Sequence, residues 1–314
     1  MRPTAATRVL ALLGDPVEHS GSPTMHNAAI AHASLDGVYV ALRCAPDDLD
    51  GLMRGLAGAG GGGNVTLPYK QRAASILDEP SEAVRRTGAC NTFWGDGAGR
   101  LHGDNTDVEG FKRALDALVD GSGPGDARRG GSRPDVARPD VARPDVARPA
   151  VARSNVARPG GSARGARVLL AGSGGAARAV LVGLLEEHAD QVVLVNRTPE
   201  RALALARSIG GERTRVETVA DRLDGQSFDL VVNATSVGLD AREASPIGLD
   251  RLGPVGAVLD LVYGQRPTPL VRAAEALGIP AADGAEMLVR QGAASFERWW
   301  GMPAPLDAMR QALS

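Results

Sequence analysis

The segment 167–185, RVLLAGSGGAARAVLVGLL, joins a short apolar run, a glycine-rich turn and an almost uncharged helical stretch. Residues 168–171 are long enough for one buried strand. Residues 176–185 contain a single charged side chain, Arg178, which predicts a helix packed tightly against a sheet. A strand, a glycine turn and a helix in this order are typical of the phosphate-binding unit of a dinucleotide-binding fold.

The glycine turn contains the residues that this unit needs. Gly172 allows a tight turn, Gly174 lets backbone N–H groups approach a pyrophosphate, and Ala176 permits close helix–sheet contact. The helix N-terminus, with unpaired N–H donors and a partial positive charge, would hold the anion. A simple tight turn between a strand and a helix is the alternative. The pattern predicts cofactor contacts at Gly172, Gly174, Gly175 and Ala176.

The next apolar run, 191–195, indicates which dinucleotide is bound. Asn196 and Arg197 follow it, at the point where NAD-binding proteins usually place a carboxylate for the ribose 2′-hydroxyl. A guanidinium instead binds a 2′-phosphate through two charge-assisted hydrogen bonds. Arg201 lies one helical turn further on and would face the same phosphate. The alternative is a helix that begins at Pro199 and has solvated arginines. We favour NADP, held by Asn196, Arg197, Thr198 and Arg201.

Length and composition limit the remaining possibilities. The chain has 314 residues, which favours two domains over one core, and its net charge of −2 gives no basic face for nucleic acid. We find no apolar run of membrane-spanning length and no apolar signal-peptide segment at the N-terminus. Cys44 and Cys90 are interpreted as buried free thiols in a reducing cytoplasm, because a zinc site needs more ligands. A cytoplasmic protein without a metal is expected.

Strands alternate with helices along most of the chain, which predicts an α/β fold. In the first half we expect strands at 8–13, 38–43, 64–67 and 89–94, and helices at 24–33, 47–56, 83–88 and 108–119. A further helix is expected to start near Tyr69, after a break at Pro68, and residues 58–63 are expected to be a flexible glycine run. In the second half we expect further strands at 228–232 and 257–261, and helices at 268–277, 287–300 and 305–313.

Residues 120–165 have a different composition from the rest of the chain. Arg-Pro-Asp-Val-Ala recurs with a five-residue period from Arg133, Arg138 and Arg143, between glycine-rich flanks. Regular prolines prevent a helix, and the segment has too little apolar surface for a core. We predict a disordered insertion with polyproline II character. A docking motif built on the spaced arginines is the alternative.

Lys70 and Asp107 are the candidate catalytic residues. Lys70 opens a predicted helix directly after a polar strand end, and Asp107 lies in a predicted turn with Asp104, Asn105 and Thr106. Taken singly, each residue also fits an ordinary structural role, as a surface lysine or as a helix-capping aspartate. The motifs around them decide the interpretation.

Eight motifs occur in one order: Ser20-Gly-Ser22-Pro, Asn64-Val-Thr-Leu-Pro-Tyr-Lys70, Ala89-Cys-Asn-Thr92, Gly103-Asp-Asn-Thr-Asp107, Gly172-Ser-Gly-Gly-Ala176, Asn196-Arg-Thr198, Asn233-Ala-Thr-Ser236 and Met287-Leu-Val-Arg-Gln291. Together they resemble the shikimate dehydrogenase family. The resemblance covers nearly the whole chain except the N-terminal tail and the insertion, and every catalytic position matches.

The resemblance implies a two-domain α/β enzyme with a cleft between an N-terminal α/β substrate domain and a Rossmann-like NADP-binding domain. The substrate domain would comprise residues 1–107 and the C-terminal helices 287–314. Residues 108–119 would form a connecting helix, and residues 166–286 the NADP-binding domain. The implied reaction is the reversible NADPH-dependent reduction of 3-dehydroshikimate to shikimate, in chorismate and aromatic amino-acid biosynthesis.

The resemblance also implies roles for particular residues. Lys70 and Asp107 would form the catalytic pair, in which the ammonium group of Lys70 donates a proton to the new alkoxide and the neutral amine removes it in reverse. Which of the two residues is the base stays open, because their protons are coupled. The implied substrate contacts are Ser20 and Ser22 to the carboxylate, Thr66, Asn91 and Gln291 to hydroxyls, Asn64 in the pocket and Tyr263 at its rim. Thr235, Leu261 and Gly284 would complete the cofactor site.

One position departs from the pattern. Glu286 stands where many relatives have glycine, and the resemblance places it beside the nicotinamide, which predicts an altered cofactor affinity or geometry.

Two alternative functions remain. A quinate/shikimate dehydrogenase usually has an acidic residue after the second dinucleotide strand, which Asn196-Arg197-Thr198 disfavours, and a non-catalytic nucleotide-binding regulator would not need Lys70 and Asp107. The oligomeric state, for which a homodimer is considered, stays open.

We predict that the insertion is dispensable. Deletion of residues 131–161 leaves glycine-containing segments on both sides that can span a short gap. Turnover of shikimate should stay unchanged, and the melting temperature should stay within a few degrees, when steady-state kinetics and thermal unfolding are compared with the full chain. A folded deletion variant that binds NADPH but has lost most of its turnover would show that the repeat acts on the site.

Overall fold

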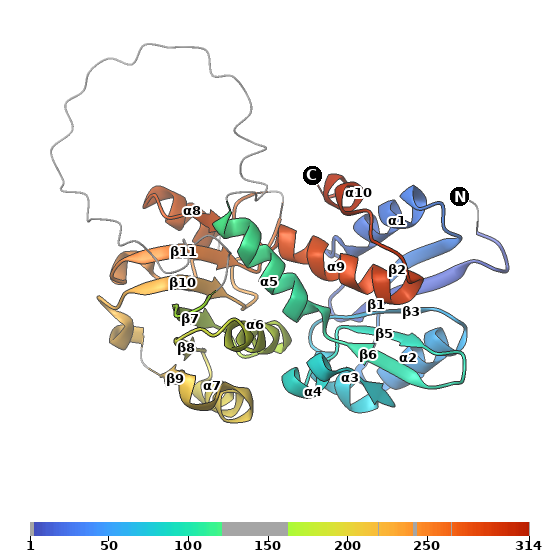
Figure 1. Cartoon of the computed structure of the whole chain (residues 1–314), viewed down its shortest axis with the longest axis horizontal. Coiled ribbons are helices and arrows are strands. Elements are labelled where there is room, and N and C mark those ends of the chain that lie inside the picture. The colour runs from blue at the N-terminus through green and yellow to red at the C-terminus, as the bar shows by residue number, and fades with distance from the viewer. Residues whose placement is uncertain (1–2, 121–162, 219, 241–243, 265, 314) are drawn as a thin grey trace, which may run out of the picture.

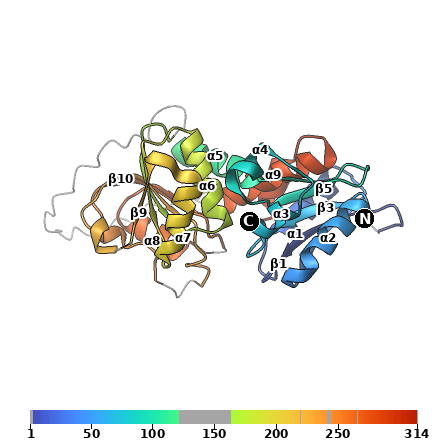
Figure 2. The same cartoon turned by 90° about the horizontal axis from the view of Figure 1, so that it is seen from below.

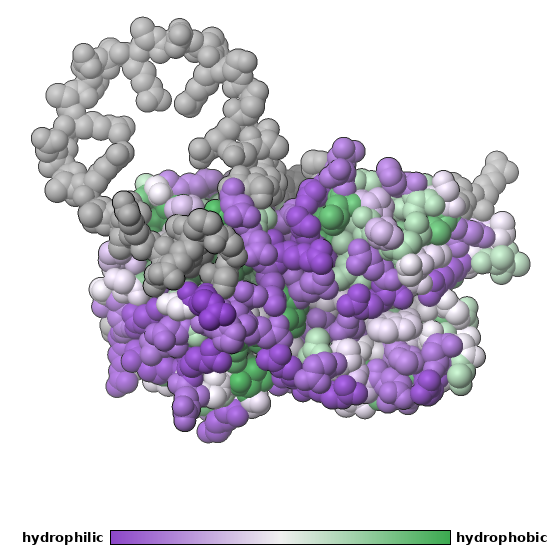
Figure 3. Space-filling view, in the orientation of Figure 1, coloured by the Kyte–Doolittle hydropathy of each residue, from purple (hydrophilic) through white to green (hydrophobic). Residues whose placement is uncertain are grey.

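The computed structural model describes residues 3–120, 163–218, 220–240, 244–264 and 266–313. It contains two α/β domains that lie side by side, each built on its own sheet of six strands (Figure 1). On the face drawn in Figure 3 the surface is mostly hydrophilic, with small, separate apolar patches. The predicted insertion at 120–165 lies almost entirely outside the described residues.

The first domain has a mixed sheet with the strand order β2-β1-β3-β5-β6-β4. Its strands are β1 (Arg8–Gly14), β2 (Gly37–Arg43), β3 (Gly62–Val65), β4 (Glu79–Pro80), β5 (Thr92–Gly95) and β6 (Leu101–Asp104). β1 pairs in parallel with β2 and β3, whereas β5 is antiparallel to both β3 and β6. The parallel strands β1 and β3 therefore end at the same edge of this sheet.

Helices cover both faces of this sheet. They are α1 (Ser22–His32), α2 (Leu49–Gly58), α3 (Lys70–Ile76), α4 (Glu82–Thr87), α9 (Ala285–Trp300) and α10 (Leu306–Gln311). Successive residues of a strand point to opposite faces. Leu10 of β1 accordingly packs in one core with residues of α1, α9 and α10, while Ala11 packs in the other with residues of α2 and α3. The C-terminal helices thus return to the first domain.

The second domain has a fully parallel sheet with the strand order β12-β11-β10-β7-β8-β9. Its strands are β7 (Arg167–Ala171), β8 (Gln191–Val195), β9 (Thr214–Glu217), β10 (Phe228–Asn233), β11 (Val255–Asp260) and β12 (Ala281–Ala282). Counted from β7, this is the doubly wound order of dinucleotide-binding domains. The near-continuous apolar strands follow from helices covering both faces.

Three α-helices belong to this domain: α6 (Gly175–Glu186), α7 (Pro199–Leu205) and α8 (Pro269–Ala276). A short π-helix (Ala206–Gly210) continues α7, and short 3-10 helices lie at Gly211–Arg213, Ala220–Leu223 and Leu249–Arg251. In the first domain a 3-10 helix (Pro46–Asp48) precedes α2. The predicted two-domain α/β architecture is therefore what the structure has.

α5 (Thr106–Val119) leads from the first domain to the second and lies against α9, which runs back (Figures 1 and 2). The two helices touch at Gly110, where an added Cβ would lie 2.7 Å from the Cβ of Gln291. Further along α5, Phe111 and Leu115 are buried in the core of the second domain. This helix therefore belongs to the packing of both domains.

Three local predictions need correction. The glycine run at 58–63 ends in strand β3, because a Cβ at Gly63 would lie 2.0 Å from the backbone oxygen of Ala11. Asp107 lies inside α5 rather than in a turn, since the side-chain oxygen of Asn91 accepts a hydrogen bond from the Thr106 N–H and lets the helix start there. The predicted disorder does not hold at Ala163, because this residue is fully buried in the core of the second domain.

His26 is a buried titratable group in the core of the first domain. It is 0 % exposed, and its ring stacks on Tyr39 at a centroid distance of 4.5 Å. Neither ring nitrogen has a hydrogen-bond partner among the described residues. Burial lowers the pKa of His26 to about 3, because the charged ring would lose its hydration.

We predict that His26 makes folding stability fall as the pH falls from about 6.5 toward 3. The unfolded chain binds a proton at the ordinary histidine pKa while the folded chain does not, which costs about 1.4 kcal/mol per pH unit in that range. Urea unfolding at pH 7.5, 6.5, 5.5 and 4.5 should show a flatter profile for His26→Phe. The exposed His32 on the same helix provides the control His32→Gln, which should keep the wild-type slope. Equal slopes for His26→Phe and the wild type would assign the pH dependence to other groups.

Candidate active site

A cleft of about 480 Å³ lies between the two domains, a size that suits small-molecule binding. Its walls come from the ends of strands in both sheets and from the N-terminal ends of α3, α5, α6 and α9. Every site residue that the sequence predicted lines this cleft: Ser20, Ser22, Asn64, Thr66, Lys70, Asn91, Asp107, Gly172, Gly174, Gly175, Ala176, Asn196, Arg197, Thr198, Arg201, Thr235, Leu261, Tyr263, Gly284 and Gln291.

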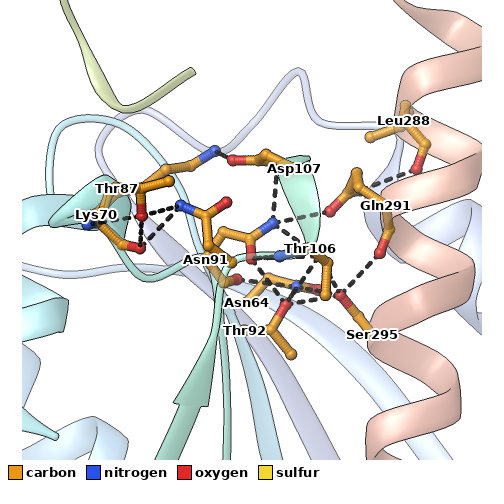
Figure 4. Close-up of polar contacts among 12 residues, drawn as sticks. Asn64, Lys70, Thr87, Asn91, Thr92, Thr106, Asp107, Leu288, Gln291 and Ser295 are labelled. Atoms are coloured by element: carbon orange, nitrogen blue, oxygen red, sulfur yellow. Dashed lines mark hydrogen bonds and ion pairs between the residues drawn. The ribbon is translucent and has the colours of Figure 1, made fainter. Parts of the chain in front are cut away.

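Lys70 and Asp107 form an ion pair at the centre of the cleft (Figure 4). The Lys70 Nζ donates to Asp107 Oδ2 over 2.6 Å, and the two side chains are 15 % and 6 % exposed. Lys70 is the first residue of α3 and Asp107 the second of α5, so both groups stand on rigid elements. The ammonium group has three N–H donors, and those not bonded to Asp107 remain for a ligand oxygen.

Asn91 fixes the second oxygen of Asp107. Its Nδ2 donates to Asp107 Oδ1 over 2.9 Å and lies 3.3 Å from Gln291 Oε1. The orientation of the Asn91 amide is determined, because the Thr106 N–H donates to its oxygen over 2.8 Å. The Gln291 amide is oriented in the same way, by donation from its Nε2 to the Leu288 carbonyl. Both carboxylate oxygens of Asp107 thus have defined partners.

Beneath these residues lies a buried layer of three hydroxyls, from Thr92, Thr106 and Ser295 (Figure 4). The Ser295 Oγ lies 2.7 Å from Thr92 Oγ1 and 3.1 Å from Thr106 Oγ1. The Nδ2 of Asn64 donates into this layer, and its oxygen accepts from the Tyr39 hydroxyl over 2.8 Å. Burial raises the pKa of Tyr39, which stays a donor.

No role was predicted for these three hydroxyls, although Thr92 and Thr106 belong to two of the eight sequence motifs. The signal that was available is spacing, because Ser295 follows Gln291 by four residues and lies on the same face of α9. The layer connects the C-terminal helix to the strand ends beside the Lys70–Asp107 pair.

A hydrogen bond crosses the rim of the cleft near the two serines. Tyr263, from the loop after β11, accepts from the Gly21 N–H over 3.4 Å. Gly21 lies between Ser20 and Ser22 at the start of α1. The side chain of Ser22 is buried, and the Ser20 hydroxyl accepts from the Ser22 N–H over 3.2 Å. Tyr263 therefore lines the cleft beside the two serines, and its predicted role at the substrate stays a prediction.

The glycine turn faces the Lys70–Asp107 pair from the second domain. Gly172 has φ of +117°, which favours glycine, and Gly174 has open space where a side chain would stand. Gly175 starts α6, and an added Cβ there would lie 2.9 Å from the Cδ of Lys70. The N-terminus of α6 therefore opens into the cleft with its backbone N–H groups accessible, next to the lysine.

Arg197 and Arg201 line the cleft from the loop after β8 and from the first turn of α7. Both are exposed, and neither has a carboxylate partner among the described residues. Asn196 uses its side-chain Nδ2 to donate to the Thr198 carbonyl over 2.8 Å, which shapes the turn before α7. Guanidinium groups in such a position have the chemistry to bind an anion.

Contacts outside the cleft also join the two domains. Arg178 of α6 donates to the Thr87 carbonyl at the end of α4, and Arg86 of α4 pairs with Glu186 of α6. Arg178 is half-buried, and burial lowers its pKa. These contacts lie on the α4–α6 side of the interface and support the arrangement in which Gly175 meets Lys70.

Glu286 is not among the residues that line the cleft, and its predicted effect on cofactor affinity or geometry stays a prediction. Its buried carboxylate accepts from Arg290 Nε over 2.6 Å and from Arg310 over 2.8 Å and 2.9 Å. Burial raises the pKa of Glu286, but the hydrogen bonds from the two guanidinium groups outweigh it and the pKa is lowered. Glu286 therefore joins α9 to α10, because Arg310 attracts it away from the cleft.

The lining of the cleft also includes apolar residues for which no role was predicted. Leu67 of the first domain and Val237 and Leu239 of the second are exposed at the cleft.

Both cysteines are free and buried, and burial raises the pKa of Cys90 to about 12. Of the described helices, none combines the length and apolar character needed to cross a membrane, and the described residues contain no cluster of metal-ligating side chains.

Curated relatives match this chain over nearly its full length. Two named shikimate dehydrogenase (NADP(+)), from Magnetococcus marinus and Rubrobacter xylanophilus, are 35 % and 37 % identical to it, and each alignment covers 98 % of this chain and 96 % of the relative. The chain belongs to the shikimate dehydrogenase family. The family models agree: shikimate dehydrogenase substrate binding domain matches residues 12–93, shikimate / quinate 5-dehydrogenase residues 152–240, and shikimate 5'-dehydrogenase C-terminal domain residues 284–313.

A solved member of the shikimate dehydrogenase family shares the fold. Shikimate 5-dehydrogenase from Thermus thermophilus, in complex with NADP(H) and shikimate, is 34 % identical to this chain with a TM-score of 0.75. The match covers 97 % of this chain and 98 % of that one. The match thus includes both domains of this chain.

Proposed function

We propose that this protein is an NADP-dependent shikimate dehydrogenase, which reduces 3-dehydroshikimate to shikimate and catalyses the reverse reaction. The observation that supports this most directly is the Lys70–Asp107 ion pair, which faces a glycine turn and a pair of arginines across one cleft. An acid–base group next to a dinucleotide site suits hydride transfer to a carbonyl.

The residues of the second domain fit NADP. Open space at Gly174 lets a pyrophosphate approach the N-terminus of α6, and Arg197 and Arg201 would bind a 2′-phosphate. Asn196 stands where a carboxylate would repel that phosphate. Thr235, Leu261 and Gly284, which line the cleft between the glycine turn and Gln291, would border the adenine and nicotinamide. NADPH, when bound, supplies the hydride.

We assign proton transfer to Lys70. A carbonyl that accepts a hydride becomes an alkoxide, and the ammonium group stabilises this charge and donates the proton. Asp107 holds the Lys70 Nζ at 2.6 Å and would bind a substrate hydroxyl, while Asn91 keeps the carboxylate in place. In the reverse direction the neutral amine of Lys70 removes the proton from shikimate.

The other polar residues of the first domain would bind the substrate. Ser20 and Ser22 suit a carboxylate, because their hydroxyls donate hydrogen bonds without adding a charge. Thr66, Asn91 and Gln291 would contact ring hydroxyls, with Asn64 in the pocket wall and Tyr263 at the rim. We assign substrate binding to residues 1–107 with 287–314, and NADP binding to residues 166–286. A homodimer in the cytoplasm stays a prediction, and light scattering tests the oligomeric state.

The direct test is to mix the purified protein with shikimate and either NADP⁺ or NAD⁺ and to follow the absorbance of the reduced cofactor. We expect shikimate-dependent reduction of NADP⁺, with a much lower kcat/KM for NAD⁺. Quinate in place of shikimate tests the broader specificity. Absence of reduction with shikimate, in a folded protein that binds NADPH, would contradict the proposed activity.

Lys70→Ala should lower turnover by about 10²–10⁴-fold and leave the affinity for NADPH largely intact, because a general acid–base group contributes about this much. Stopped-flow and steady-state kinetics with shikimate measure the loss. Lys112→Ala is the matched control, since Lys112 pairs with Glu187 outside the cleft. Turnover of Lys70→Ala within about threefold of the wild type would remove this residue from the mechanism.

Arg197→Ala should weaken NADP⁺ binding by about tenfold or more and leave NAD⁺ nearly unchanged. The substitution removes a charge-assisted hydrogen bond to the 2′-phosphate, which contributes roughly 1.5–3 kcal/mol to the binding free energy. Calorimetric titration with each cofactor measures this, and Arg207→Ala, at an exposed arginine outside the cleft, provides the control. If both cofactors weakened equally, Arg197 would act on the fold of the turn rather than on the phosphate.

A further inference from the structure

Asp260 is a fully buried carboxylate at the end of β11, at 0 % exposure. It accepts hydrogen bonds from the Thr268 hydroxyl over 2.6 Å, from Asn233 Nδ2 over 2.8 Å and from the Val262 N–H over 3.1 Å. All three donors are neutral, and the salt bridges found among the described residues do not include Asp260; burial raises its pKa. A buried charge is costly without partners, so these hydrogen bonds have to be satisfied together.

Asn233, at the end of the neighbouring strand β10, is also 0 % exposed and extends this network. Its Oδ1 accepts from the Thr235 N–H over 3.0 Å and from the Thr235 hydroxyl over 2.7 Å. Its Nδ2 donates to Asp260 and, over 3.1 Å, to the Val237 carbonyl. Since a carboxylate and a carbonyl only accept and a backbone N–H only donates, the amide orientation of Asn233 is fixed.

The two buried residues thereby hold two loops that form the second-domain wall of the cleft. Thr235, Val237 and Leu239 line the cleft from the loop after β10, and Leu261, Val262 and Tyr263 line it from the loop after β11. Gly238 allows the first loop to close against Asp260, because it has φ of +105° and its Cβ position lies 3.9 Å from Asp260 Oδ2. Asp260 and Asn233 themselves do not line the cleft.

We propose that Asp260 and Asn233 are positioning residues that set the part of the cofactor site formed by the loops after β10 and β11. Asp260 holds the Leu261–Tyr263 loop through the Val262 N–H and holds Asn233, which in turn holds Thr235 and Val237. The proposal rests on the proposed function, since it names the residues that shape the same cofactor site. It extends that function to residues that touch neither cofactor nor substrate.

Variants at Asp260 separate the effect of its negative charge from the effect of its hydrogen bonds. In Asp260→Asn, the remaining oxygen still accepts from Asn233 and Val262, and the new amide nitrogen donates to the Thr268 hydroxyl. This variant keeps the positions of both loops. Asp260→Ala and Asn233→Ala remove acceptors and leave buried donors unpaired, so the loops shift.

The experiment measures dissociation constants for NADP⁺ and NAD⁺ by calorimetry without shikimate, together with thermal unfolding. We expect Asp260→Ala and Asn233→Ala to weaken both cofactors by the same factor, about tenfold, because the arginines proposed to bind the 2′-phosphate lie on another segment, after β8, and are untouched. Asp260→Asn should restore binding to within about twofold of the wild type. Asp229→Asn, the same substitution at the opposite end of β10, is the matched control and should bind like the wild type.

The outcomes separate the proposal from its alternatives. Loss of thermal stability with both dissociation constants within twofold of the wild type would overturn it, because the residues would then be structural only. Selective weakening of NADP⁺ would also overturn it, since the effect would lie at the 2′-phosphate. If Asp260→Ala does not fold, Asn233→Ala and Asp260→Asn decide the question. Failure of the wild type to oxidise shikimate would contradict the proposed function and would not change these binding constants.

Discussion

The arrangement of the two domains depends on the close contact between α5 and α9. At Gly110 no side chain separates these helices, and an added Cβ would lie 2.7 Å from that of Gln291. At Gly183 the next helix, α6, approaches Phe111 of α5 in the same way, at 2.8 Å. Gly110 and Gly183 thus allow α9, α5 and α6 to pack closely against one another. This packing brings Asp107, Gln291 and the start of α6 to one cleft.

Much of the second domain could be predicted from the sequence, because its signals are local. An apolar run followed by Gly172-Ser-Gly174 determines a strand, a turn with positive φ and a helix start, and parallel strands place their carboxyl ends at one edge. Arg197 was predicted correctly to lie at that edge. In the first domain the motifs around Lys70 and Asp107 identified residues that line the cleft. The start of α5 was placed too late, because the side chain that accepts from the Thr106 N–H, Asn91, comes from another segment.

The features that the sequence did not reveal depend on partners far along the chain. Nothing in the sequence around Ser295 distinguishes it from an exposed serine on a helix. Its burial beside Thr92 follows only from the return of α9 to the first sheet. Gly63 belongs to a glycine run that resembles a flexible loop, yet the backbone of β1 leaves no room for a side chain. Glu286 turns toward Arg310, which lies on another helix, so its position could not follow from the local motif.

The contact between Gly175 and Lys70 ties the hydration of the lysine to the distance between the domains. Its aliphatic chain lies against the first residue of α6, while its ammonium group stays bonded to Asp107 within the first domain. Separation of the domains would remove that wall and let water reach the lysine, although the ion pair itself would remain. The limited hydration of the Lys70 side chain is therefore a property of the two domains together and not of either domain alone.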